Sequence, residues 1–141
     1  MQLKELIKFI RYDACTGELL TCAKPNALDA SWRVIRPNEE NKITTTVVGC
    51  NLKIKADRLI WYMHSGTQPN RRQVVFHKNL DVLDNRLHNL VLISKNEYFR
   101  LVEAMKNISG DMKIIPHLVD AFSYVIYYKL KGRLHKEVVQ D

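Results

Sequence analysis

The chain has 141 residues, of which 46% are hydrophobic, and its formal net charge is +7. This length and apolar content predict one globular domain with a buried core, which excludes an intrinsically disordered chain. Lys4, Glu5, Lys8 and Arg11 interrupt the N-terminal segment, so it is neither a signal peptide nor a membrane span, and we expect a cytoplasmic protein.

The N-terminal region predicts a short helix followed by a β-hairpin. Apolar residues at helical spacing favour an amphipathic helix over residues 3–9. Residues 9–13 and 18–21 then flank a turn at Gly17, because glycine tolerates a positive φ angle.

A loop and a second hairpin are expected next. Residues 23–42 are polar and rich in turn-forming residues, so they predict a long loop, in which Trp32 is either a local anchor or a surface contact. Residues 42–48 are rich in β-branched side chains and residues 51–55 alternate apolar and polar ones. This pattern is typical of two paired strands.

The middle of the chain predicts a helix and then a buried strand. Residues 56–64 have apolar side chains at helical spacing, Gly66 ends the helix, and Pro69 blocks its extension. The run over residues 74–76 is β-branched and aromatic, which favours a strand that ends at His77.

A polar loop rich in Asn and Asp follows this strand, and a helix follows the loop. Ser94 is a plausible N-cap, and Glu97, three residues later, completes a capping box. Apolar residues at helical spacing continue the helix to Met105.

The last part of the chain predicts a β-hairpin. Residues 124–128 and 134–139 are strand-like and flank a turn at Gly132. Lys131 and Arg133 would lie at the hairpin tip, where a β-ribbon can enter a DNA groove. The alternative is an edge hairpin that packs on the core.

Positive charge is concentrated in the middle of the sequence. Residues 51–100 carry nine Lys/Arg against four Asp/Glu, whereas residues 1–50 carry seven against six. Lys53 and Lys55 project from one face of their predicted strand. Such a concentration is the expected footprint of phosphate binding, although a solvated basic face would have the same composition.

The three cysteines, Cys15, Cys22 and Cys50, are odd in number and lack paired CxxC spacing. A structural zinc site requires four ligands, usually with such spacing. We therefore expect reduced thiols and no bound zinc.

The central segment resembles the ββα-metal core of HNH endonucleases, especially the phage and intron-encoded branch. There the pattern runs "vDHinGdk.DNR.sNLr.vt..eN", preceded by "HRLiW…G..P" and, further upstream, by "YDp.TGel". The matching residues here are Tyr12-Asp13, Thr16-Gly17-Glu18, Arg58-Leu59-Ile60-Trp61, Gly66, Pro69, His77, Asp84-Asn85-Arg86, Asn89-Leu90 and Ser94.

The resemblance implies an α+β fold in which N-terminal β-hairpins and a helix pack on a ββα-metal core, with a C-terminal β-hairpin. We expect an HNH-endonuclease-like domain over residues 1–110, with its core at 56–106. The hairpin appendage would then cover residues 111–141.

Two positions depart from the family pattern. Phe76 stands where the family has an Asp that helps hold a divalent metal, and Tyr98 stands at the second protein ligand. Phe76 offers no oxygen, and a neutral phenol is a poor ligand for a hard cation. His77 keeps the position of the general base, and Asn89 keeps that of the residue that braces the loop.

We therefore expect no metal cofactor and a DNA-binding protein that acts by occupying a site or by recruitment, without cleavage. Its partner would be double-stranded DNA, in the cytoplasm of a phage-infected bacterial cell. The residues expected to contact DNA are Lys53, Lys55, Arg71, Arg72, Lys78, Arg86, Lys95, Arg100, Lys131 and Arg133.

Two other functions stay open. One is an active, nicking HNH endonuclease that uses Mg²⁺ or Mn²⁺, with His77 and Asn89 as catalytic residues and Asp81 or Asp84 in a relocated metal site. The other is a phage-encoded inhibitor that binds a host enzyme. A homodimer is compatible with each. Without a metal, His77 would instead stabilise the loop by bonding to Asn89.

Overall fold

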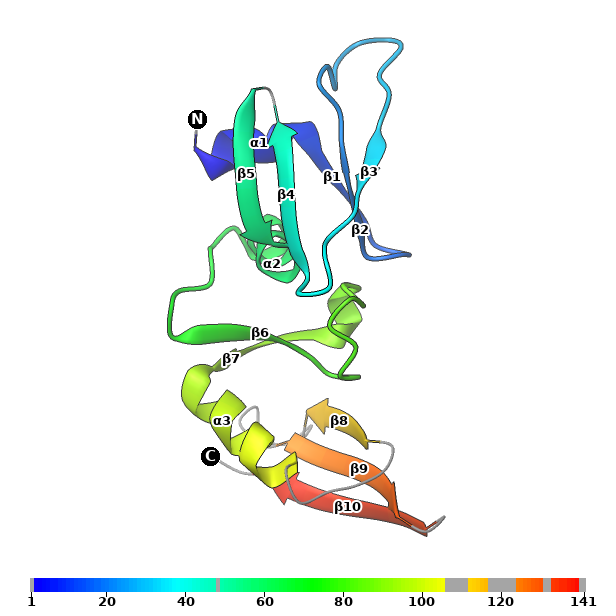
Figure 1. The fold of residues 1–141 in the computed structure, drawn as a ribbon, viewed down its shortest axis with the longest axis vertical. Helices are drawn as coiled ribbons and strands as arrows, with labels where there is room; N and C mark the ends of the chain where they lie inside the picture. The colour runs from blue at the N-terminus through cyan, green and yellow to red at the C-terminus, as the bar shows by residue number, and fades with distance from the viewer. Residues whose placement is uncertain (1, 48, 106–111, 117–123, 131–132, 140–141) are drawn as a thin grey trace. The chain divides into compact units, whose positions relative to one another are not determined.

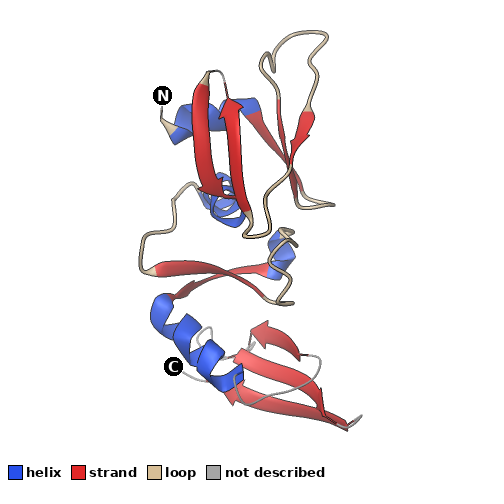
Figure 2. Cartoon of the chain, in the orientation of Figure 1, coloured by secondary structure: helices blue, strands red, loops and turns tan. Residues whose placement is uncertain are grey.

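The computed structural model describes residues 2–47, 49–105, 112–116, 124–130 and 133–139. These residues form short helices and four small antiparallel sheets, so the predicted α+β class is confirmed (Figures 1 and 2). Contacts divide the chain into two compact units. Unit 1 comprises Met1–Gln68 and Val82–His88, and unit 2 comprises Pro69–Asp81 and Asn89–Asp141.

Unit 1 contains the N-terminal helix, two small sheets and the second α-helix. The predicted helix, both predicted hairpins and the turn at Gly17, whose φ is 78°, are confirmed. The elements are α1 (Leu3–Leu6), the 3-10 helix η1 (Ile7–Phe9), β1 (Ile10–Asp13), β2 (Glu18–Thr21), β3 (Arg33–Ile35), β4 (Lys42–Val47), β5 (Cys50–Lys55) and α2 (Ala56–Ser65).

The loop predicted over residues 23–42 is wrong in one part, because it contains β3. Leu19 pairs with Ile35 and Leu20 with Val34, which makes β3 the third strand of the β1–β2 sheet. Ile35 is buried at this position. Three residues are too few to show an alternating pattern, so burial against β2 rather than local propensity selects this strand.

The core of unit 1 fixes α2 and the β4–β5 hairpin. Ile43 on β4 and Leu59 and Ile60 on α2 are almost completely buried. The helix ends as predicted at Gly66, which has a left-handed φ of 80° and donates its N–H to the carbonyl of Tyr62.

Unit 2 begins with two paired strands and a helix. These elements are β6 (Gln73–His77), β7 (Leu90–Ser94) and α3 (Lys95–Met105), and the short 3-10 helix η2 (Leu87–Asn89) precedes β7. The capping box is confirmed, because Glu97 donates its N–H to the Ser94 hydroxyl and the Glu97 carboxylate accepts the N–H of Ser94. The order β6–β7–α3 is the expected ββα arrangement.

The C-terminal region contains the predicted hairpin, formed by β9 (Tyr124–Leu130) and β10 (Arg133–Val139). The sheet has a third strand, β8 (Met112–Pro116), which the sequence did not predict and which pairs with β9. The turn at Gly132, Lys131 and the predicted domain boundary at residue 110 lie outside the described residues.

Across the part of the chain that the structure describes, no helix combines the length and the apolar character needed to span a membrane.

Candidate functional site

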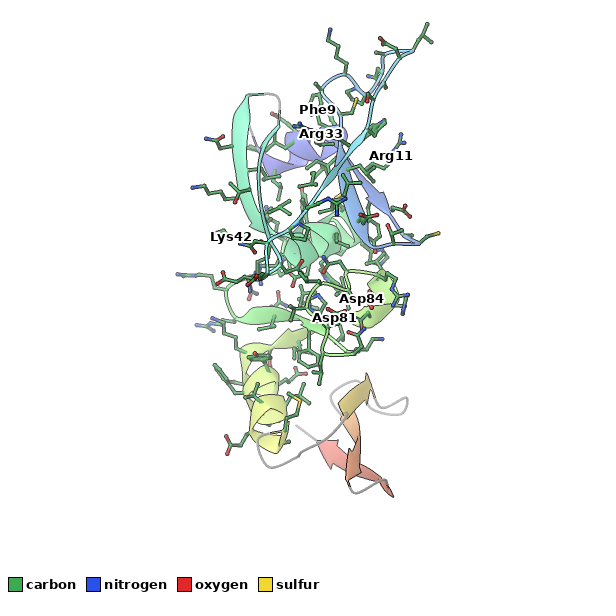
Figure 3. The ribbon with its side chains drawn as sticks, turned by 45° about the vertical axis from the view of Figure 1, so that its right-hand side comes forward. Phe9, Arg11, Arg33, Lys42, Asp81 and Asp84 are labelled. Atoms are coloured by element: carbon green, nitrogen blue, oxygen red, sulfur yellow. The ribbon has the colours of Figure 1, made fainter. Side chains whose placement is uncertain are left out.

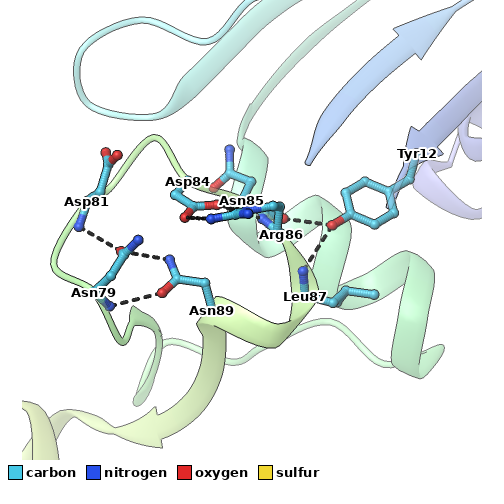
Figure 4. Close-up of polar contacts among 8 residues, drawn as sticks. All are labelled: Tyr12, Asn79, Asp81, Asp84, Asn85, Arg86, Leu87 and Asn89. Atoms are coloured by element: carbon cyan, nitrogen blue, oxygen red, sulfur yellow. Dashed lines mark hydrogen bonds and ion pairs between the residues drawn. The ribbon is translucent and has the colours of Figure 1, made fainter. Parts of the chain in front are cut away.

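The start of the loop between β6 and β7 is held by one buried amide side chain. Asn89 accepts the N–H of Asn79 at its side-chain oxygen (2.9 Å), and its side-chain nitrogen donates to the Asn79 side-chain oxygen (2.9 Å). The carbonyl of Asn89 accepts the N–H of Lys78 (2.8 Å). These bonds, of which Figure 4 draws the side-chain ones, make Asn89 the brace of the loop that follows His77.

His77 is buried at the end of β6, with 6% of its surface exposed. Its carbonyl accepts the N–H of Leu80, which closes the first turn of the loop. Leu80 has a φ of 66°, in the left-handed region that a branched side chain rarely adopts. The backbone three residues after His77 is therefore strained, and packing or bonding elsewhere holds it there.

Phe76 and Tyr98 meet as a pair of aromatic rings. Their centroids are 6.1 Å apart and their planes cross at 63°, which is a favourable edge-to-face geometry. Phe76 is buried with Ile93 and Leu101 in one apolar cluster. The side chains that pack against this cluster, in addition to Tyr98, are those of Val74, Leu80, Val91, Ala104 and Met105.

This environment does not fit a divalent cation. Mg²⁺ and Mn²⁺ take oxygen ligands and keep several waters, whereas Phe76 offers carbon alone and Tyr98 directs its ring onto Phe76. Within residues 2–105, apart from the gap at 48, no three His, Cys, Asp or Glu side chains gather closely enough to hold a metal ion. Asp84 is instead bonded through both of its oxygens to Arg86.

A second polar cluster lies in unit 1 and holds residues 85–87. The Tyr12 hydroxyl donates to the carbonyl of Asn85 (2.8 Å) and accepts the N–H of Leu87 (3.0 Å). The side chains of Asn41 and Asn85 exchange two hydrogen bonds, of 2.7 and 2.8 Å, and both residues are buried. Sequence patterns gave no signal for this pairing, because the partners are 44 or more positions apart.

Two groups in this cluster have shifted pKa values. Burial raises the pKa of the Tyr12 hydroxyl, an effect that the hydrogen bond from the N–H of Leu87 opposes. The hydrogen bond to the Asp84 carboxylate raises the pKa of the Arg86 guanidinium further above its already high value, so Arg86 stays charged at every practical pH.

The raised pKa of Tyr12 predicts a loss of stability in alkali. The un-ionised Tyr12 hydroxyl contributes its full stabilisation below the unfolded-state pKa of about 10. This contribution is lost as pH rises through the higher folded-state pKa. Urea unfolding between about pH 9 and 11 should therefore show a steeper decline in the wild-type chain than in the Tyr12→Phe variant. Parallel declines in the two proteins would contradict this role of the hydroxyl.

The predicted DNA contacts of unit 2 fall at both ends of the β6–β7 ribbon. Arg71 and Arg72 are exposed at one end, beside exposed Lys95, whose N–H donates to the carbonyl of Arg72 (2.8 Å). Lys78 is half-buried at the other end, where Asn89 holds its backbone. Arg100 is exposed on α3.

The β4–β5 hairpin has a basic face that is larger than predicted. Lys53 and Lys55 are exposed, and Lys42, which Figure 3 labels, stands directly opposite Lys55 in the strand register. Like charges on opposite strands destabilise a hairpin unless an anion compensates. Lys42 was missed because only the register brings it to this face. Lys131 lies outside the described residues, and Arg133 begins β10.

Trp32 has a charged neighbour that the sequence did not indicate. The guanidinium of Arg11 lies 4.2 Å from the centroid of the Trp32 ring, which is a cation–π contact. The residue predicted to be either an anchor or a surface contact is half-buried and bound to an arginine from β1.

Comparison with known proteins gives one positive finding. Residues 55–98 match the model of a family described as HNH endonuclease, and this segment includes His77, Asn89 and both aromatic positions. Neither the curated proteins nor the solved structures give a match.

Proposed function

We propose, from the relationship of residues 55–98 to the HNH endonucleases, a nucleic-acid-related family, that this chain is a DNA-binding protein without nuclease activity. It would derive from a phage-type HNH endonuclease and act by occupying double-stranded DNA or by recruiting another protein to it.

The contact between Phe76 and Tyr98 carries the proposal of inactivity. These residues stand at the positions of the family's two protein ligands, and their rings touch each other within an apolar cluster. In an HNH nuclease the metal binds the scissile phosphate and stabilises the leaving oxygen. A general base alone contributes about 10²–10⁴-fold, which is far below the rate enhancement that phosphodiester cleavage requires.

Leu80 is a third departure from the family pattern, and its side chain lies in the same apolar cluster as those of Phe76 and Tyr98. The family pattern has glycine at this position, where the backbone has φ near 66°, and here a leucine side chain packs against the Phe76 cluster. A left-handed leucine costs about 1–2 kcal/mol, so its apolar contacts must offset that cost. A leucine and two aromatic side chains thus occupy positions where the family pattern has glycine or polar residues.

The exposed basic residues support the proposal of DNA binding. Arg71, Arg72 and Lys95 form an exposed cationic end of the β6–β7 ribbon, and the basic face of the β4–β5 hairpin lies in unit 1. Each phosphate contact releases counterions, so affinity should fall steeply as salt increases. Between about 50 and 200 mM salt, six or more contacts would lower affinity by about 10³-fold or more.

The test is a gel assay that scores DNA shift and DNA cutting together. Supercoiled plasmid and short duplexes would be incubated with the wild-type chain, with and without Mg²⁺ or Mn²⁺. We expect a salt-dependent shift, no cutting, and an unchanged outcome when metal is added.

The variant His77→Ala is the control for residual catalysis. Metal-dependent nicking by the wild-type chain that His77→Ala abolishes would establish an active endonuclease and overturn the proposal. A chain that shifts no DNA at low salt would overturn the DNA-binding part and leave protein binding as the alternative.

A further inference from the structure

Arg86 belongs to a loop in which hydrogen bonds hold the residue before it, Asn85, and the residue after it, Leu87. The Tyr12 hydroxyl donates to the carbonyl of Asn85, and its oxygen accepts the N–H of Leu87. The Asn85 side chain is locked to Asn41 by two hydrogen bonds. The phenol of Tyr12, whose two bonds Figure 4 draws, and the Asn41–Asn85 amide pair therefore hold both neighbours of Arg86.

The backbone of Arg86 is also packed against the β1–β2 turn. A Cβ atom added to Gly17 would lie 2.7 Å from the backbone nitrogen of Arg86 and 2.8 Å from the carbonyl carbon of Asn85. Contact this close leaves no room for the loop to shift toward the turn. The start of the Arg86 side chain is therefore in a fixed position before any ligand arrives.

The guanidinium is oriented by Asp84. Its Nε donates to Oδ1 (2.8 Å) and its Nη2 to Oδ2 (2.7 Å), which is a bidentate pair. Because the group is planar, Nη1–H and the second N–H of Nη2 form a separate edge that faces away from Asp84. The Arg86 side chain is 42% exposed, whereas that of Asp84 is 11% exposed.

This pairing changes what Arg86 can recognise. Phosphate contacts gain their strength from net positive charge, and the formal charges of Arg86 and Asp84 cancel at a separation of 2.7 Å. The parallel donors of the outer edge remain, and they match two neutral acceptors. In the major groove, O6 and N7 of guanine are such a pair, and arginine bound to them is the commonest specific contact.

We infer that Arg86, held by Asp84, reads a guanine in the major groove of double-stranded DNA instead of contacting a phosphate. This inference rests on the proposed DNA-binding function. It gives the chain a residue that determines sequence specificity, whereas the lysines and arginines of the basic faces would supply affinity that is independent of sequence.

The experiment uses the full chain and a library of double-stranded oligonucleotides with a randomised central segment. Selection with the wild-type chain should enrich a guanine at one position. Replacement of that guanine, or Arg86→Ala or Arg86→Lys in the protein, should weaken binding to the selected duplex about 10- to 100-fold. Arg86→Lys keeps the positive charge, so in that variant affinity for random duplex and the salt dependence should stay close to wild type.

Asp84→Asn provides the complementary variant, because it removes the neutralising charge and keeps the shape. It should strengthen binding to random duplex, steepen the dependence of log affinity on log salt by about one, and reduce the preference for guanine. Lys24→Ala removes an exposed charge from a loop of the same unit and should leave the guanine preference intact. Thermal unfolding of each variant checks that it is folded.

The outcomes separate the two proposals. Equal weakening of Arg86→Ala on all duplexes, with a salt slope reduced by about one, would identify a phosphate contact and overturn guanine reading alone. Selection without any enriched guanine would overturn it as well. A wild-type chain that binds no duplex at low salt would overturn the proposed function together with this inference.

Discussion

Replacing Gly17 by alanine should lower the free energy of unfolding by about 2–5 kcal/mol. A left-handed backbone costs a residue with a Cβ about 1–2 kcal/mol, and overpacking adds about 1–3 kcal/mol. The added Cβ would lie 2.7 Å from a backbone nitrogen, which cannot move away as a flexible side chain could. Urea unfolding followed by far-UV circular dichroism measures the effect.

Gly66→Ala is the matched control, because Gly66 has nearly the same φ angle, 80°. Among the described residues, its chain neighbours and own helix apart, no heavy atom lies within 4 Å of the added Cβ. It should cost only the left-handed backbone term, about 1–2 kcal/mol. Equal losses of stability in the two variants would mean that the β1–β2 turn moves enough to relieve the clash with the backbone of residues 85–86. In that event the contact with Gly17 would not fix the position of the Arg86 backbone.

Truncating Phe76 to alanine should destabilise the chain by about 3–5 kcal/mol. The ring is 94% buried, since 6% of its surface is exposed, and it contacts Tyr98 and the cluster around Ile93 and Leu101. Removing it leaves a cavity and ends the aromatic contact. The free energy of unfolding from urea titration is again the measurement.

The control for this variant is Phe99→Ala. Phe99 follows Tyr98 on α3 and is 61% exposed, so its truncation should cost less than about 1 kcal/mol. A loss of stability in Phe76→Ala as small as that in Phe99→Ala would contradict the place of the Phe76 ring in the core.

Local signals predicted most of the elements correctly. Ser94 and Glu97 are three residues apart and satisfy each other at the start of α3, and Gly66 ends α2 by its own conformation. Such features depend on a few neighbouring residues, so the sequence displays them directly. Strands β3 and β8 were missed because each is short and gains its stability from pairing with a longer strand.

The candidate site was predictable in its positions and not in its bonds. The order of residues located His77, Phe76, Asn89 and Tyr98, but the edge contact of the two rings needed the fold. The partners of Tyr12 are 73 and 75 positions away, and no periodicity links residues at such separations. The bidentate bond of Arg86 to Asp84 is likewise visible only in three dimensions.

Unit 1 is discontinuous in sequence, and this has a consequence for synthesis on the ribosome. Its last piece, Val82–His88, is made only after the thirteen residues Pro69–Asp81 of unit 2 have been added. At about 5–20 residues per second, the phenol of Tyr12 must wait roughly 4–15 s for its partners to emerge. During that interval unit 1 lacks the segment Val82–His88, so chaperones have time to bind the incomplete unit.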